Sequence, residues 1–113
     1  MTRVFIILLG LSVYLATPAA AQSADAVEQG KKVYAAQKCQ VCHAVGGVGN
    51  KKGILDDVGT RLSADQIRQW IVSATEMTAK TKAARKPVMK SYTLPKEDLE
   101  ALVSYLGSLK AKP

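Results

Sequence analysis

The sequence of 113 residues has little of several residue types from which proteins build functional sites: one His, two Cys, one Trp and one Phe. A single His excludes any site that needs two within one chain, such as the HExxH zinc site or a Cys₂His₂ zinc site. With eight Gly and four Pro, the chain is also not of low complexity. No segment is repeated, and no run alternates convincingly as a β-strand. The length is that of one small domain, which makes a multidomain enzyme improbable.

The first 21 residues have the parts of an export signal. A basic start with Arg3 precedes an apolar run of 13 residues, 4–16, and Ala19 and Ala21 supply small residues before a cleavage point. The alternative is an uncleaved membrane anchor, but the apolar run is shorter than the ~20 residues that span a bilayer. The sequence therefore predicts a cleaved signal peptide over 1–21 and a mature domain over 22–113. This domain would be periplasmic, with no stable membrane insertion after cleavage.

The predicted mature domain is small and basic. Its net charge falls from +7 to +6 because Arg3 is lost with the signal peptide, and the only Phe is lost with it too. Domains of this size that have few large apolar side chains often need a disulfide, a metal or a cofactor to be stable. The two cysteines are therefore the next feature to interpret.

Both cysteines and the only histidine fall within Cys39-Gln40-Val41-Cys42-His43. A disulfide across two residues would close a tiny loop and constrain the unfolded chain very little. A thioredoxin-like redox pair needs a βαβ context, which the pattern lacks. The C-x-x-C-H spacing is the signal for covalent haem attachment, because one turn sets both thiols and the imidazole on the same side. It predicts one haem c per chain, bonded to Cys39 and Cys42, with His43 as an axial ligand of the iron.

A second axial ligand must come from a methionine, since the chain has no second histidine. Met89 lies in 86–92, a segment with a proline and no helical period, which suits a side chain that must cross a pocket. Met77 follows an apolar helical pattern and is as readily explained as packing. Met89 is favoured, with Met77 or an open position as the alternatives.

Three segments have the apolar period of helices, so we predict an all-α fold of three main helices joined by loops. Asp25 and Ser63 each begin a capping-box pattern, and Pro95 suits the first turn of the last helix. The apolar stripes are Val27, Gly30 and Tyr34; Ile67, Trp70, Ile71 and Ala74; and Leu99, Leu102, Val103, Leu106 and Leu109.

The order and spacing of these motifs resemble the small class I, single-haem cytochromes c of bacteria over most of 22–113. The resemblance implies three helices and loops wrapped around one haem, and an electron-transfer protein rather than an enzyme. It implies that the first and last helices cross closely, with Gly30 against Tyr105. It also implies that Arg61 and Trp70 hold a haem propionate, although Trp70 could equally be a plain core residue.

The chain departs from the family pattern at two places. Where the family often has Gly-Pro, this chain has Gly53-Ile54, so the carbonyl that orients His43 is kept while the stiffening proline is lost. Where the family often has Met-Pro, Met89 is followed by Lys90, which leaves the ligand segment looser. The second departure keeps open an alternative function, a gas-binding sensor or weak peroxidase-like haem with a displaceable sixth ligand. The chain could also be the haem module of a larger oxidoreductase.

Five cations and no acid fall within residues 80–90. One interpretation is a solvated loop that keeps the protein soluble. The other is a docking face that steers an acidic redox partner to the haem edge. We expect a monomer that docks such partners and does not bind nucleic acid, since an exported haem protein has little use for it. The five residues are Lys80, Lys82, Arg85, Lys86 and Lys90.

Overall fold

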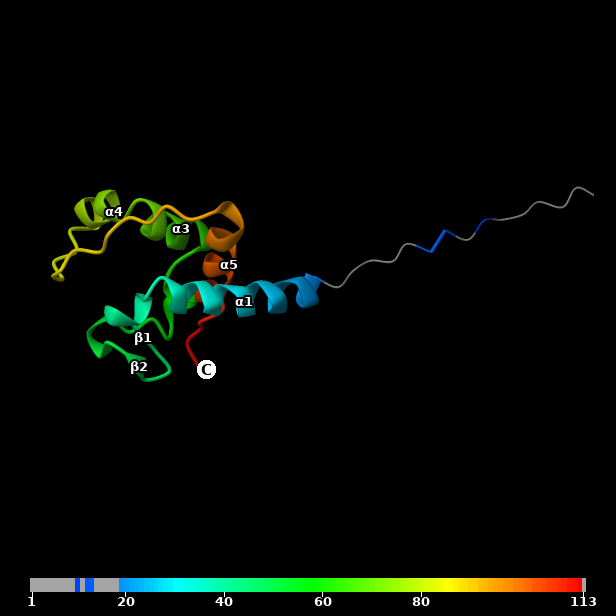
Figure 1. Ribbon diagram of the computed structural model, residues 1–113, viewed down its shortest axis with the longest axis horizontal. Coiled ribbons are helices and arrows are strands. Elements are labelled where there is room, and N and C mark those ends of the chain that lie inside the picture. Colours follow the sequence, from blue (N-terminus) through cyan, green and yellow to red (C-terminus); the bar gives the residue numbers. More distant parts are fainter. Residues whose placement is uncertain (1–9, 11, 14–18, 113) are drawn as a thin grey trace, which may run out of the picture.

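The computed structural model describes residues 10, 12, 13 and 19–112, and within them the chain is mainly helical (Figure 1). The predicted all-α class is therefore confirmed. The α-helices are α1 (Ala19–Ala36), α2 (Val58–Arg61), α3 (Ala64–Val72), α4 (Ala74–Thr81) and α5 (Lys96–Gly107). Between α1 and α2 lie two 3-10 turns, η1 (Cys39–Val41) and η2 (Lys51–Gly53), and a short antiparallel ribbon, β1 (Ala44–Val45) and β2 (Val48–Gly49).

The crossing of α1 over α5 is the centre of the fold (Figure 1). A Cβ on Gly30 would overlap the carbonyl oxygen of Ala101 and the Cβ of Tyr105, so only glycine lets the two helices approach this closely. Beside this contact, the rings of Tyr34 and Tyr105 meet edge to face with centroids 5.6 Å apart. The expected pairing of Gly30 with Tyr105 is confirmed.

Helix α3 packs against α5 and completes the core. Its predicted capping box is present: the Ser63 hydroxyl accepts from the Gln66 N–H at 3.2 Å, and the Ser63 N–H donates to the Gln66 side chain at 2.8 Å. On the solvent side, Arg68 donates to both carboxylate oxygens of Glu100 at 2.9 and 2.8 Å, which ties α3 to α5. The buried core cluster is Val33, Tyr34, Val58, Ile67, Ile71, Leu102, Val103, Tyr105 and Leu106.

Two helix boundaries differ from those expected, and two helices were not expected. Helix α1 begins at Ala19, so Asp25 lies inside it and the capping box predicted there is wrong; three successive alanines, the best helix formers, extend the helix backward. Pro95 lies one position before α5, where its carbonyl accepts the first helical hydrogen bond, from Leu99 at 2.9 Å. The short helix α2 and helix α4 were not expected as separate elements. Helix α4 starts at Ala74 directly after Ser73 ends α3, and it buries Met77.

The C-terminal residues fasten the short helix α2 to the end of α5. The Gly59 N–H donates to the Leu109 carbonyl at 2.8 Å, and the Lys110 ammonium donates to the Gly59 carbonyl at 2.5 Å. The Ala111 N–H donates to the Thr60 hydroxyl at 2.8 Å. A Cβ on Gly59 would overlap the carbonyl of Gly107, so a second glycine permits close approach here. Helix α2 is therefore positioned by the chain's last described residues.

Two arms extend from this helical base toward the same side (Figure 1). The first arm contains η1, the ribbon and η2, and its turn is made by Gly46 and Gly47 at φ values of +60° and +80°. Asp56 holds that turn by accepting from the Gly46 N–H at 2.7 Å. The second arm contains α4 and the segment 82–95 that returns to α5.

The predicted signal peptide, 1–21, lies largely outside the described residues. Helix α1 begins at Ala19, so cleavage between Ala21 and Gln22 would remove only the start of its first turn. No helix in the described part of the chain is both long and apolar enough to cross a membrane.

Candidate cofactor site

A cavity of about 790 Å³ lies between the two arms and the helical base. Its volume is within the range of roughly 300–1,000 Å³ that is typical of cofactor sites. Apolar side chains form most of its walls, and no carboxylate from the described residues lines it. The lining includes Tyr34, Cys39, Cys42, His43, Leu55, Val58, Arg61, Ile67, Trp70, Ile71, Arg85, Met89, Lys90, Tyr92, Leu102 and Leu106.

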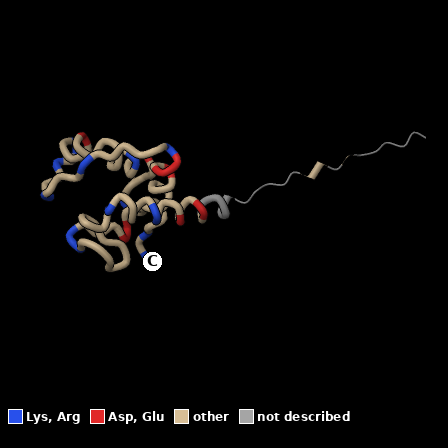
Figure 2. Tube along the Cα trace, viewed as in Figure 1, with Lys and Arg blue, Asp and Glu red and all other residues tan. Residues whose placement is uncertain are grey.

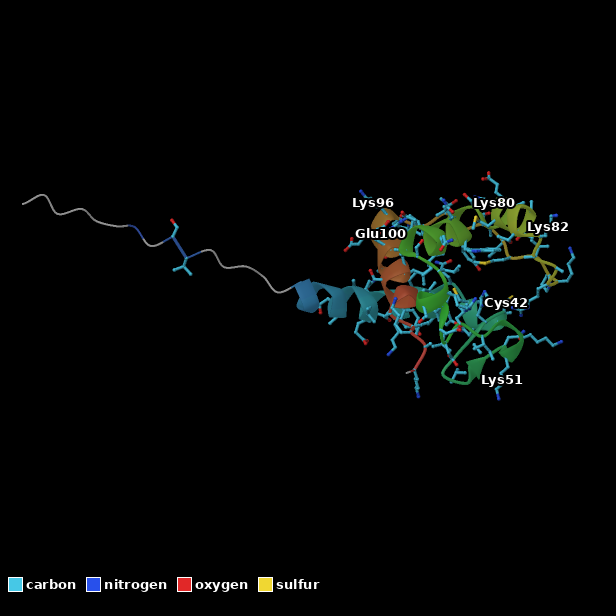
Figure 3. All side chains as sticks on the ribbon, turned by 180° about the vertical axis from the view of Figure 1, so that it is seen from behind. Cys42, Lys51, Lys80, Lys82, Lys96 and Glu100 are labelled. Atoms are coloured by element: carbon cyan, nitrogen blue, oxygen red, sulfur yellow. The ribbon has the colours of Figure 1, made fainter. Side chains whose placement is uncertain are left out.

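The C-x-x-C-H segment forms one wall of this cavity. Lys38, with a left-handed φ of 57°, breaks the path of α1 and starts the turn η1. Within the turn, the Cys42 and His43 N–H groups both donate to the Cys39 carbonyl, at 3.1 and 2.9 Å. Both cysteines are half-buried and not joined by a disulfide, and burial raises the pKa of the Cys39 thiol. In Figure 3, Cys42 lies on the same arm as Lys51, on the side toward the arm that carries Lys80 and Lys82.

A hydrogen bond from its Nδ1 to the backbone orients the imidazole of His43. Nδ1 of His43 donates to the Gly53 carbonyl at 3.0 Å, so the orientation expected from the Gly53 carbonyl is present although no proline follows. Burial lowers the pKa of His43, and the nearby Arg85 cation lowers it further, while the hydrogen bond to Gly53 acts in the opposite sense. The imidazole is therefore neutral near pH 7. With the proton on Nδ1, its Nε2 lone pair is free to bind a metal.

The two candidate methionine ligands lie in different places. Met89 is half-buried and lines the cavity, on the segment 82–95 that faces the C-x-x-C-H wall. Met77 is buried in α4 and does not line this cavity; it contacts a smaller pocket with Ser73 and Glu76. The structure thus brings Met89, and not Met77, to the same space as His43.

Arg61 and Trp70 also line the cavity, one from α2 and the other from α3. The Arg61 Nε donates to Asp57 at 2.9 Å, which orients the half-exposed guanidinium. No hydrogen bond of the Trp70 indole N–H to another described residue is present in the structure. Both side chains therefore line the cavity with N–H donors that have no partner among the described residues. Their expected contact with a haem propionate stays a prediction.

Two tyrosines at the cavity were not singled out as site residues from the sequence. The Tyr34 hydroxyl is buried without a hydrogen-bond partner among the described residues, and burial raises its pKa to about 12. An unpaired hydroxyl in the cavity wall is a site for a polar atom of a bound group.

The second tyrosine, Tyr92, lies with its ring centroid 4.9 Å from the Lys90 ammonium, and its backbone N–H donates to the Ile71 carbonyl at 2.8 Å. Tyr92 thereby anchors the segment that carries Met89. The sequence feature that could have indicated this role is the position of Tyr92, three residues after Met89.

A mainly apolar cavity with two thiols and a neutral imidazole on one wall and a thioether on the facing segment fits a flat, apolar, metal-bearing group such as haem. These features define an all-α haem protein. A sequence model of the family described as Cytochrome c matches residues 27–110, and the chain belongs to that family. Comparison with curated proteins and with solved structures gives no match. As in its family, the domain binds covalently attached haem c and serves in electron transfer.

Proposed function

We propose that this protein is an exported, single-haem electron carrier in which Cys39 and Cys42 hold the haem covalently and His43 and Met89 are the axial ligands. The observation that carries the proposal is that all four side chains line one cavity. Three come from a single turn, and the fourth comes from a segment about 50 residues later in the chain. No other sulfur or imidazole of the described residues lines that space.

The side chains present are suited to electron transfer rather than to bond-making chemistry. The bound haem supplies a reversible one-electron change at iron. The Gly53 carbonyl fixes the ring of His43, the apolar walls exclude water, and a thioether ligand needs no proton in either redox state. Because no carboxylate of the described residues lines the cavity, a general acid–base pair is not supplied there. This supports a carrier rather than an enzyme.

The five cations of residues 80–90, which we call the basic face, border the cavity. All five side chains are exposed, none forms an ion pair within the described part of the chain, and Arg85 and Lys90 line the cavity itself. In Figure 2, Lys and Arg follow the second arm, whereas acidic residues gather at the start of α5. We infer that the basic face steers an acidic partner protein to the haem edge in the periplasm, and that the carrier is a monomer. The basic face is Lys80, Lys82, Arg85, Lys86 and Lys90.

The proposed ligand is tested by replacing each methionine in the purified holoprotein. Met89→Ala is expected to abolish the weak far-red absorption band that marks a methionine–iron bond in oxidised cytochromes c of this family. Met77→Ala should keep the band, since Met77 packs elsewhere in α4. Loss of the band in Met77→Ala, with the band intact in Met89→Ala, would refute the assignment.

The alternative function, a gas-binding or weak peroxidase-like haem, is favoured by one observation. Between Ala84 and Lys90, the segment 82–95 makes no hydrogen bond to another described residue, and only Met89 there is even half-buried. A ligand on such a segment is easier to displace. Rapid binding of CO by the reduced, unmodified protein would favour this alternative, whereas slow or absent binding would favour the electron carrier.

The docking role is tested with partners of known charge. The variant Lys80→Gln/Lys82→Gln/Lys86→Gln removes three cations that do not line the cavity. We expect its rate of electron transfer to an acidic partner protein to fall at least ~10-fold at low ionic strength and the difference to shrink as salt is added. The matched control is Lys31→Gln/Lys32→Gln/Lys112→Gln, with the same change in net charge at sites outside residues 80–90. Equal rates for the two triple variants would contradict the proposed docking face.

A further inference from the structure

Arg85 of the basic face places its charged group beside the opposite wall of the cavity. It starts on the segment that carries Met89, and its Nη1 contacts Gly53 on the first arm. The three atoms that a Cβ at Gly53 would meet are Nη1 of Arg85, the carbonyl oxygen of Cys42 and Nδ1 of His43. A cation therefore lies beside the hydrogen bond that orients the imidazole.

No acidic side chain among the described residues pairs with this charge. Arg85 forms no ion pair with another described residue, and no carboxylate within that part of the chain lines the cavity. Nη1 of Arg85 and Nδ1 of His43 both lie within 3 Å of the position that a Cβ on Gly53 would take. The guanidinium thus disfavours added positive charge at the imidazole and at whatever the imidazole binds.

Two physical effects of this cation act in the same direction on a bound iron. Its field opposes the extra positive charge of the oxidised state, and this repulsion falls off with distance as in any charge pair. Its closeness to Nδ1 of His43 also disfavours the build-up of positive charge on the ring, which makes the imidazole a poorer electron donor. Both effects favour the reduced iron.

We propose that Arg85 is a positioning residue that raises the reduction potential of the haem by holding its cation against Gly53 and the His43 imidazole. All five cations of the basic face act on partner docking, and Arg85 acts on the driving force in addition. The inference rests on the proposed function to the extent that His43 must be the axial ligand.

The test measures the midpoint potential of the holoprotein by spectroelectrochemical titration for three variants. Arg85→Gln should shift the one-electron equilibrium toward the oxidised form by about 3- to 10-fold, where tenfold corresponds to about 59 mV. Arg85→Lys, which keeps the charge on a shorter side chain, should show an intermediate shift. Lys86→Gln is the matched control: it removes an equal charge from the adjacent residue, whose side chain does not line the cavity, and should shift the equilibrium less than half as much.

A second readout follows the hydrogen bond itself. The exchange rate of the His43 Nδ1 proton with solvent, measured by NMR, is expected to change in Arg85→Gln and to stay at the wild-type value in Lys86→Gln. Equal potentials for wild type and Arg85→Gln would overturn the inference. So would a potential that falls only together with loss of the far-red band, since Arg85 would then act by retaining Met89. If the wild type itself lacks the low-spin spectrum of histidine ligation, the proposed function fails, and that outcome is separate from any effect of Arg85.

Discussion

The helical base and the segment 82–95 line the same cavity, but they are stabilised in different ways. At the base, α1 and α5 meet through Gly30 and the pair of Tyr34 and Tyr105. The core side chains of these two helices are at most 9% exposed. Along 82–95, most side chains are exposed, and the backbone is held mainly at its ends, by Ala83 to Thr78 and by Tyr92 to Ile71. One wall of the cavity is thus fixed by packing and the other by a few contacts.

This difference assigns the two walls different tasks. A packed base keeps the cavity in shape while charge at its centre changes, which limits the rearrangement that accompanies electron transfer. The less constrained wall carries Met89, Arg85 and the exposed lysines, which set ligation, potential and docking under our proposals. Substitutions should therefore change stability at the base and redox or docking properties along 82–95.

The largest effect on stability is expected from truncation to alanine, compared between the two regions. Leu102→Ala removes a side chain that is 3% exposed in the core and should lower the free energy of unfolding by about 2–5 kcal/mol. Val88→Ala, in the segment 82–95, removes a side chain that is 41% exposed and should cost within about 0.5 kcal/mol. Denaturant unfolding of the two holoproteins measures the difference. A comparable loss in both would show that the segment is packed as tightly as the base.

A smaller effect is expected where α1 meets α5. Gly30→Ala forces a Cβ against the backbone of Ala101, and we expect a loss of about 1–3 kcal/mol. The control is Gly107→Ala, because a Cβ there meets nothing within 4 Å and should be neutral or stabilise α5 by up to ~1 kcal/mol. Thermal unfolding followed by circular dichroism measures both. If the two substitutions had the same effect, the close crossing would not be a source of stability.

The smallest effect concerns the ion pair between α3 and α5. The hydrogen bonds from Arg68 hold the pKa of Glu100 below its ordinary value, so its contribution to stability is present at neutral pH and is lost as pH falls through that lowered pKa. The fall in melting temperature between neutral and acidic pH should therefore be smaller in Glu100→Gln than in wild type. Glu97→Gln, an exposed control without an ion pair among the described residues, should follow wild type. Parallel curves for Glu100→Gln and wild type would contradict the coupling.

The elements that could be predicted from the sequence are those that depend on residues close together in the chain. The C-x-x-C-H turn, the Ser63 capping box and the apolar stripe of α5 each depend on residues within one or two turns of each other. The close approach at Gly30 came from the family resemblance, since spacing alone does not say which helix a glycine faces.

What was missed depends on distant or weak signals. Helix α4 has a mixed surface and follows α3 with a single residue between them, so its start has no capping pattern of its own. Asp25 has the right pattern for a helix start, yet the alanines before it extend α1 past that point. The contact of Arg85 with Gly53 joins residues far apart in the chain through a long side chain, and no local rule predicts it.

The hydrogen bonds that tie Leu109, Lys110 and Ala111 to α2 have a consequence for the order in which the protein is built. The wall that contains Arg61 and the wall formed by α5 are complete only when the last residues of the chain are in place. The Cys39–His43 turn is synthesised long before that point. Before that point the two thiols and the imidazole border an incomplete cavity, and the later residues close the fold around it.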